Sequence, residues 1–288
     1  MKPSSFEYVV PGSVAEAVDA LSDEPGAMVL AGGQSLIPAM NFRLAGPSRL
    51  IDLRKIDDLR QLVIKDGVIH IGAMVRHREL ELNGEVHRAN PLIRAALGYV
   101  AHVPIRNRGT VVGSLCHADA AAEMPLVMVL TGGTLVAQST SGGRRISADD
   151  FFQFHMTTTR APDELIVGAE IPVMPQDAGF AFEEFARRNG DYAIAAVGAI
   201  VSRDSGGLIA EASVAACGIG SRPLRLEAVE QAVLGTGLDE DDLSAAVAAS
   251  EQYVTAPDDI HATTAYRRHL LGGLLRRALT RAGQQRLA

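Results

Sequence analysis

The chain has 288 residues, a formal net charge of −7 and 47% hydrophobic residues. This composition is typical of a globular protein and excludes a disordered or fibrous chain. Since domains usually contain about 100 to 200 residues, the length predicts two of them. The acidic balance provides no attraction to phosphate backbones or anionic lipids, so neither nucleic acid nor a membrane surface is expected as a partner.

Cys116 and Cys217 are the only cysteines in the sequence. Two thiols supply neither a disulfide network nor the four ligands of a typical iron–sulfur cluster, so any such cluster is expected on another chain. The longest apolar run, residues 193–201, is too short to span a bilayer. The first residues also lack the apolar core of a signal peptide. We therefore expect a cytoplasmic protein with no membrane span.

Residues 1–54 predict a lobe that contains a glycine turn between a strand and a helix. Ser13 and Glu16 form a capping box at the start of a short helix. Residues 27–31 are typical of a buried strand, 32–35 of a tight turn, 36–44 of a helix and 49–53 of a second strand.

Residues 55–176 predict the second lobe of the same domain. Asp66-Gly67 separates two apolar runs, 62–65 and 68–71, and therefore predicts a two-residue hairpin. The remaining elements expected here are helices near residues 76–82, 91–100 and 124–130, a hairpin from 135–138 and 144–147, and a strand over 164–173 that ends at Pro172.

Residues 177–288 predict a separate domain, because the pattern changes near residue 176. Three strand-like runs (180–188, 193–203 and 208–218) precede three helical runs (224–234, 241–254 and 264–287). Strands followed by helices are typical of the α+β class. We expect an antiparallel three-stranded sheet with helices.

Familiar catalytic motifs are absent: the sequence contains no P-loop, no H-E-x-x-H and no G-x-S-x-G. Cys116 beside His117 could be a nucleophile and a base, but neighbouring residues on a strand point to opposite faces. His117 and Asp119 would need a third ligand to hold a metal. We therefore predict no catalytic residue and no metal site on this chain.

Two segments of similar chemistry remain, Ala31-Gly32-Gly33-Gln34-Ser35 and Thr110-Val111-Val112-Gly113-Ser114. Glycine lets backbone N–H groups approach a diphosphate, and a helix that begins at Ser35 adds its positive N-terminal end. Each segment alone is more often only a turn. Together they predict two backbone cradles that hold one pyrophosphate from both sides.

Seven short blocks follow one another over essentially the whole chain. They are Ser5-Phe6-x-Tyr8, Leu30-Ala31-Gly32-Gly33-Gln34-Ser35-Leu36-Ile37-Pro38, Leu50-Ile51-Asp52-Leu53-Arg54, Ile71-Gly72-Ala73-Met74, Arg106-x-Arg108-Gly109-Thr110, Glu123-Met124-Pro125 and Gly190-Asp191-Tyr192-Ala193. In this order they resemble the FAD-binding medium subunit of the molybdenum hydroxylases, the family of xanthine dehydrogenase and carbon monoxide dehydrogenase.

The resemblance implies a two-part FAD-binding domain of the vanillyl-alcohol-oxidase type, followed by a smaller α+β domain. It implies that the two glycine segments hold the FAD pyrophosphate and that Glu123 binds the ribose or adenine end. Ile166 would make a backbone contact to the flavin, and Tyr192 would cover the isoalloxazine face. The implied cofactor-binding residues are Ala31, Gly32, Gly33, Gln34, Ser35, Thr110, Val111, Gly113, Ser114, Glu123, Ile166 and Tyr192.

The second segment departs from the family pattern at Val112, which replaces the first of two adjacent glycines, and at Ser114, where the family often has asparagine. Valine adopts a positive φ only with strain. We therefore expect that Val112 is not left-handed, and we do not count it among the cofactor contacts.

The resemblance implies an electron-transfer subunit of an oxidoreductase. FAD on this chain would accept electrons from [2Fe-2S] clusters on a small subunit and pass them to an external acceptor. A large subunit with a molybdenum–pterin cofactor would hydroxylate the substrate, in a dimer of heterotrimers. The motifs are closer to N-heteroaromatic hydroxylases such as quinoline 2-oxidoreductase than to carbon monoxide dehydrogenase. Two alternatives remain, a stand-alone FAD-dependent oxidoreductase of the same flavin fold and a cofactor-free assembly module.

Overall fold

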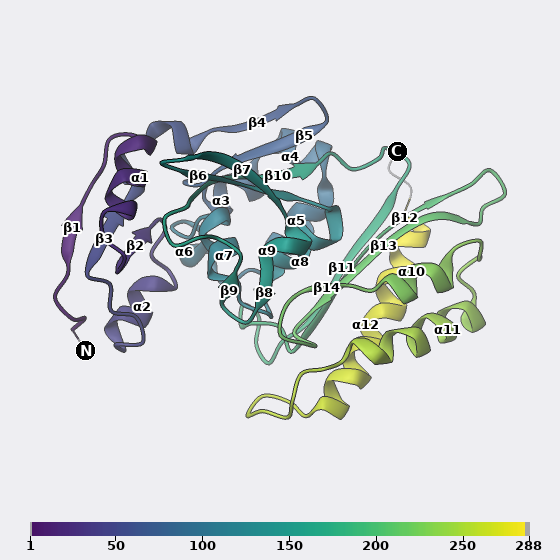
Figure 1. Cartoon of the computed structure of the whole chain (residues 1–288). Coiled ribbons are helices and arrows are strands. Elements are labelled where there is room, and N and C mark those ends of the chain that lie inside the picture. Colours follow the sequence, from purple (N-terminus) through teal and green to yellow (C-terminus); the bar gives the residue numbers. More distant parts are fainter. Residues whose placement is uncertain (1, 286–288) are drawn as a thin grey trace.

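The computed structural model describes residues 2–285 and contains three main β-sheets (Figure 1). A small parallel sheet lies at one end of the molecule, a five-stranded sheet lies in the middle, and a four-stranded sheet with the last helices lies at the other end (Figure 1). Among the helices of residues 2–285, none combines the length and the apolar character that crossing a bilayer requires.

The first lobe is a parallel three-stranded sheet in the order β1-β3-β2. Ser13 caps its first helix, because its Oγ accepts a hydrogen bond from the N–H of Glu16. The elements are β1 (Glu7–Val9), α1 (Val14–Ser22), β2 (Ala27–Leu30), α2 (Leu36–Asn41) and β3 (Arg49–Asp52). Because β2 is parallel to its neighbour, residues 31–35 lie at a carboxyl edge of a sheet, where ligands of α/β folds usually bind.

The second lobe is an antiparallel sheet in the order β4-β5-β10-β6-β7. Asp66 and Gly67 have φ angles of 52° and 75°, which is the conformation that a tight two-residue hairpin requires. Two short 3₁₀ helices, η1 (Leu53–Lys55) and η2 (Asp57–Arg60), join the lobes. The strands are β4 (Leu62–Lys65), β5 (Val68–Gly72), β6 (Thr134–Ser139), β7 (Gly142–Ser147) and β10 (Leu165–Pro172).

Six helices lie between β5 and β6, and the last of them joins the two halves of the molecule. They are α3 (His77–Leu82), α4 (Gly84–Ala89), α5 (Pro91–Leu97), α6 (Val103–Arg106), α7 (Val111–His117) and α8 (Glu123–Thr131). Residues 123–130 of α8 are all buried, because this helix packs against α5 on one side and against β12 and β13 on another. After β7 come α9 (Ala148–Phe151) and the hairpin of β8 (Phe152–Phe154) and β9 (Thr157–Thr158).

The C-terminal part is an antiparallel sheet in the order β11-β12-β13-β14, covered by helices. The long last helix buries Leu271, Leu274 and Leu275 in its packing against β11 and β12. The elements are β11 (Gly179–Phe185), β12 (Ala195–Arg203), β13 (Ile209–Cys217), β14 (Leu224–Arg225), α10 (Glu227–Val233), α11 (Glu240–Ser250), η3 (Glu251–Tyr253) and α12 (Thr264–Gln284). The end of the predicted helix 264–287 lies outside the described residues.

The α+β architecture with a smaller C-terminal part is confirmed, and the differences concern short elements. A fourth strand, β14, occupies the start of a predicted helix, and β1, α4 and α6 have no counterpart among the predictions. These elements are too short to show a periodic pattern of apolar residues. The division at residue 176 into a two-lobed domain and a second domain stays a prediction.

Candidate functional site

The first glycine segment, residues 31–35, connects the end of β2 to the start of α2. Gly33 adopts a left-handed backbone with a φ of 73°, which residues with a Cβ rarely adopt. All five residues are partly exposed. Within residues 2–285, the backbone N–H groups of residues 32–35 donate to no protein acceptor. The segment therefore presents several free N–H donors at the carboxyl edge of the first sheet.

The second segment, residues 110–114, forms the start of α7. Thr110 caps this helix, because its Oγ1 accepts a hydrogen bond of 3.1 Å from the N–H of Gly113. Val112 lies inside the helix and is not among the residues with positive φ, so the expectation that it is not left-handed is confirmed. The sequence predicted a glycine-containing turn here, and the structure shows a capped helix start instead.

The two segments lie side by side. A Cβ added to Gly32 would be 2.4 Å from the carbonyl oxygen of Arg108 and 2.9 Å from the backbone nitrogen of Thr110. A Cβ added to Gly113 would be 3.7 Å from the Cβ of Ala31. Only a glycine at position 32 allows this backbone-to-backbone contact, which brings the free N–H groups of the first segment next to the start of α7.

Two buried carboxyl groups lie between the end of α7 and the first turn of α8. Glu123, at the start of α8, is 5% exposed, and Asp119 is 7% exposed. Burial, with a smaller contribution from the charge of Asp119, raises the pKa of Glu123 to about 7, against the opposing effects of its own backbone N–H and of Arg106. Burial and the charge of Glu123 raise the pKa of Glu184, on β11, to about 8. At neutral pH, Glu123 can therefore donate as well as accept a hydrogen bond.

Tyr192 approaches the first segment from the other half of the chain, in the connection between β11 and β12. Burial raises the pKa of its hydroxyl to about 12, as do the charges of Asp119 and Glu123, while an interaction with the Ser35 side chain lowers it. The residue as a whole is nevertheless 53% exposed. Tyr192 thus has its hydroxyl near the first segment while part of the residue stays exposed.

A buried arginine holds the segment that carries Tyr192. Arg267, on α12, is 6% exposed, and its guanidinium donates to the carbonyl oxygens of Ile194 and Gly218 at 2.7 and 2.6 Å. Its other Nη atom forms an ion pair with Asp259 at 2.6 Å. Sequence reasoning missed this residue, because most arginines are exposed and no pattern along the chain distinguishes one that is buried.

Ile166 lies on β10, the central strand of the second sheet, with its side chain 3% exposed. The strand pairing is irregular between Ile166 and Gly168. The carbonyl oxygen of Val167 there accepts a hydrogen bond from the N–H of Ala73. Because the Ile166 side chain is in the core, only its backbone is available to a ligand, and the predicted backbone contact stays a prediction.

Cys116 and His117 lie on α7, so the expectation that they belong to a strand is wrong. Burial raises the pKa of the Cys116 thiol to about 12, which keeps it protonated at neutral pH. Burial lowers the pKa of His117. In the part of the chain that the structure describes, no three His, Cys, Asp or Glu side chains are grouped so that they could hold a metal ion.

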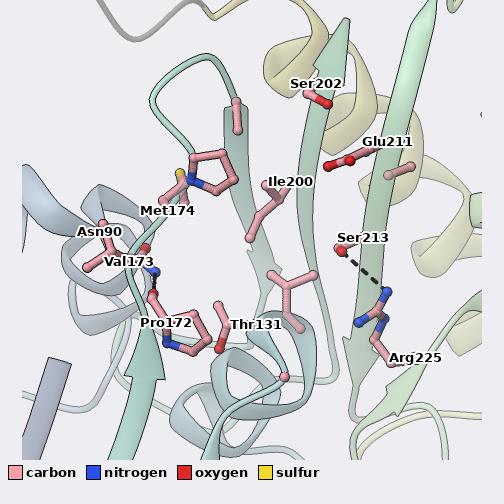
Figure 2. A pocket seen from close by; sticks show the side chains of 15 residues that line it. Asn90, Thr131, Pro172, Val173, Met174, Ile200, Ser202, Glu211, Ser213 and Arg225 are labelled. Carbon is pink, nitrogen blue, oxygen red and sulfur yellow. Dashed lines mark hydrogen bonds between the residues drawn. The ribbon is translucent and has the colours of Figure 1, made fainter. Parts of the chain in front are cut away.

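A cavity of about 190 Å³ lies between the second lobe and the C-terminal sheet, away from the two glycine segments. Figure 2 shows Asn90 on one side of the cavity, where it donates a hydrogen bond to the carbonyl oxygen of Pro172. On the other side Arg225 donates a hydrogen bond to the Ser213 hydroxyl. None of the cofactor-binding residues implied by the sequence lines it. The cavity is therefore separate from the candidate site.

Two family descriptions match consecutive parts of the chain. Residues 4–174 match the FAD binding domain in molybdopterin dehydrogenase. Residues 180–282 match the CO dehydrogenase flavoprotein C-terminal domain. The two matches together cover most of the chain and divide it where the second sheet ends and the third begins.

Relatives and solved structures align over nearly the full chain. The 6-hydroxypseudooxynicotine dehydrogenase complex subunit alpha of Paenarthrobacter nicotinovorans is 38% identical, over 98% of this chain and 96% of the relative. The nicotine 6-hydroxylase medium subunit of the same organism is also 38% identical, over 98% and 99%. A chain of quinoline 2-oxidoreductase from Pseudomonas putida 86 superposes with a TM-score of 0.95 at 35% identity and covers 100% of both chains.

Proposed function

Because this chain belongs to the family of FAD-binding medium subunits of molybdenum hydroxylases, we propose that it carries FAD and transfers electrons within a multisubunit oxidoreductase. The observation that carries the proposal is the contact between residues 31–35 and the start of α7, which places the free N–H groups of residues 32–35 beside the N–H of Thr110, for which residues 2–285 offer no acceptor. No acid–base residue is required of this chain, because a flavin itself supplies the redox chemistry when it is bound.

The residues present fit the chemistry of FAD. A pyrophosphate needs hydrogen-bond donors, and residues 32–35 have free backbone N–H groups. A ribose or adenine group needs a partner that can both donate and accept hydrogen bonds. The buried carboxyl of Glu123 can do both, because its pKa is about 7. A flavin ring needs a flat apolar surface, and the partly exposed Tyr192 carries an aromatic ring that can provide one.

Each segment then has a defined task. Residues 31–35, with Thr110, Val111, Gly113 and Ser114, bind the pyrophosphate. Glu123 orients the adenosine end, the backbone of Ile166 contacts the flavin, and Tyr192 limits access of water to one face of the ring. Residues 1–176, in two lobes, form the FAD-binding domain, and residues 177–288 supply Tyr192.

The partners follow from the family and from the thiols of this chain. The relatives include a complex subunit and a medium subunit. Cys116 and Cys217 are free cysteines, and burial raises the pKa of both thiols, so neither is prepared to bind an iron–sulfur cluster. Electrons then come from [2Fe-2S] clusters on a small subunit, next to a large molybdenum–pterin subunit, in a cytoplasmic dimer of heterotrimers that reduces an external acceptor.

We propose an N-heteroaromatic compound as the substrate of the whole complex. The names of the relatives support this class, since they include a nicotine hydroxylase and a quinoline oxidoreductase. The substrate would bind the large subunit, so no residue of this chain selects it.

Purification of the native complex tests the proposal. We expect this chain to copurify with two other chains, and the denatured complex to release FAD, molybdenum–pterin cofactor and iron. An active single chain loaded with FAD would instead establish the stand-alone oxidoreductase. A chain without flavin absorbance, whose thermal stability does not respond to FAD, would be an assembly module.

A further inference from the structure

A buried histidine lies against the peptide that links Gly109 to Thr110. His77, the first residue of α3, is 5% exposed. Its Nδ1 is 3.0 Å from the carbonyl oxygen of Gly109. The backbone N–H of His77 donates to the same oxygen at 3.0 Å. Two groups of one residue therefore hold this carbonyl.

The protonation state of His77 follows from this contact. Burial lowers its pKa to about 4, so the ring is neutral at physiological pH and carries a single N–H. A carbonyl oxygen only accepts hydrogen bonds, so the proton is on Nδ1. The buried Nε2 has no hydrogen-bond partner within residues 2–285. An unpaired buried nitrogen is unfavourable, so packing alone does not favour histidine at this position.

The other end of the same peptide faces the first glycine segment. In a planar trans peptide, the C=O and the following N–H point in opposite directions. With the Gly109 carbonyl directed at His77, the N–H of Thr110 points away from His77, and the Thr110 nitrogen is 2.9 Å from the position of a Cβ added to Gly32. Among residues 2–285, this N–H has no protein acceptor. It is therefore a free donor beside the donors of residues 32–35.

Helix α3 also holds the chain just before this peptide. Glu81, on α3, forms an ion pair of 2.9 Å with Arg106. Arg106 is 7% exposed and donates to the carbonyl oxygens of Val100 and Ala101 at 2.8 and 2.9 Å. Helix α3 thus holds the chain segment before Thr110 at two points, the side chain of Arg106 and the carbonyl group of Gly109.

We propose that His77 is a positioning residue for the cofactor: its Nδ1–H orients the Gly109–Thr110 peptide so that the N–H of Thr110 faces the pyrophosphate. This inference rests on the proposed binding of FAD. His77 does not touch the cofactor and acts only through the peptide that it holds. It follows that another side chain with a hydrogen-bond donor at the position of Nδ1 can replace histidine.

His77→Asn and His77→Leu form a matched pair for the test. The asparagine amide nitrogen occupies the position of Nδ1, and leucine has the same shape without a donor. Both variants lose the same part of the ring, so a purely structural role predicts equal effects. We expect the complex with His77→Leu to bind FAD roughly three- to tenfold more weakly than that with His77→Asn, as for loss of one neutral hydrogen bond.

The measurement is titration of FAD into the flavin-depleted complex, followed by flavin fluorescence, with thermal unfolding without FAD as the control. Equal dissociation constants for the two variants would overturn the inference. If His77→Leu does not assemble, His77→Gln replaces it, because its amide reaches the Nε2 position and should bind FAD more weakly than His77→Asn. Equal binding by these two would also overturn it. Absence of FAD from the wild-type complex would instead overturn the proposed function.

Discussion

Adding one methyl group at Gly32 should separate the two cofactor segments. The Cβ of a Gly32→Ala variant would be 2.4 Å from the Arg108 oxygen, whereas ordinary contact begins at 3.4 Å, so the backbones must move apart by about 1 Å. All the nearest atoms belong to backbone, which cannot rotate away as a side chain can. Overpacking of this kind costs about 1–3 kcal/mol of folding free energy.

The effect on FAD should exceed the effect on stability. A pyrophosphate that bridges both segments cannot keep all its hydrogen bonds when they separate by about 1 Å, because hydrogen bonds weaken beyond about 3.2 Å. Loss of one bond to a charged group corresponds to about 1.5–3 kcal/mol, or roughly tenfold to hundredfold weaker binding. Fluorescence titration of the flavin-depleted complex measures this change.

Gly46→Ala is the matched control, because it adds the same methyl group in the same lobe with no atom within 4 Å. It should bind FAD like the wild-type protein. The reasoning would be refuted if Gly32→Ala kept wild-type affinity while its unfolding showed the expected loss of stability. The pyrophosphate would then not bridge the two segments.

Three further results are expected. Gly33→Val forces a branched side chain into a left-handed backbone, so the purified variant should lose FAD by absorbance while the C-terminal domain keeps its circular dichroism. Tyr192→Ala should change the flavin spectrum or the electron-transfer rate more than the melting temperature, because the residue is 53% exposed. An unchanged spectrum and rate would make Tyr192 only a packing residue. Burial raises the pKa of Glu123 to about 7, whereas the unfolded chain has the usual value of 4.5. Between these two pH values the folded state keeps a proton that the unfolded state has released. The free energy of unfolding therefore falls as the pH rises from about 4.5 to 7. Denaturant titrations of the FAD-free chain should therefore show that the wild-type protein loses about 2.5 kcal/mol of folding free energy between pH 5 and pH 8 that Glu123→Gln does not lose. Parallel pH profiles of the two proteins would contradict the assignment.

The sequence by itself determined the local elements whose signals lie within a few residues. The Ser13 cap, the Asp66-Gly67 hairpin and the C-terminal strands and helices are confirmed, because their hydrogen bonds join residues that are close in the chain. It also determined the family, because the motif blocks occur in order along the whole chain. The absence of a left-handed residue at position 112 followed from the steric limits of valine alone.

Tertiary structure decided which of these segments meet. The contact of Gly32 with residues 108–110 joins distant parts of the chain, and no local pattern encodes it. The start of α7 was mistaken for a turn, because a glycine near a helix start has the same local signature as a glycine in a loop.

The sequence also did not predict the buried residues that hold the backbone around the candidate site. His77, Arg106 and Arg267 belong to types that are usually at least partly exposed. The packing of α3 and α12 buries His77 and Arg267 against carbonyl groups of distant residues. Arg106 is buried against the nearby carbonyls of Val100 and Ala101, where Glu81 of α3 pairs with it. The raised pKa of Glu123 arises in the same way, since α8 is covered by both halves of the molecule. Burial depends on which surfaces meet in space, and a linear pattern of residues does not specify that.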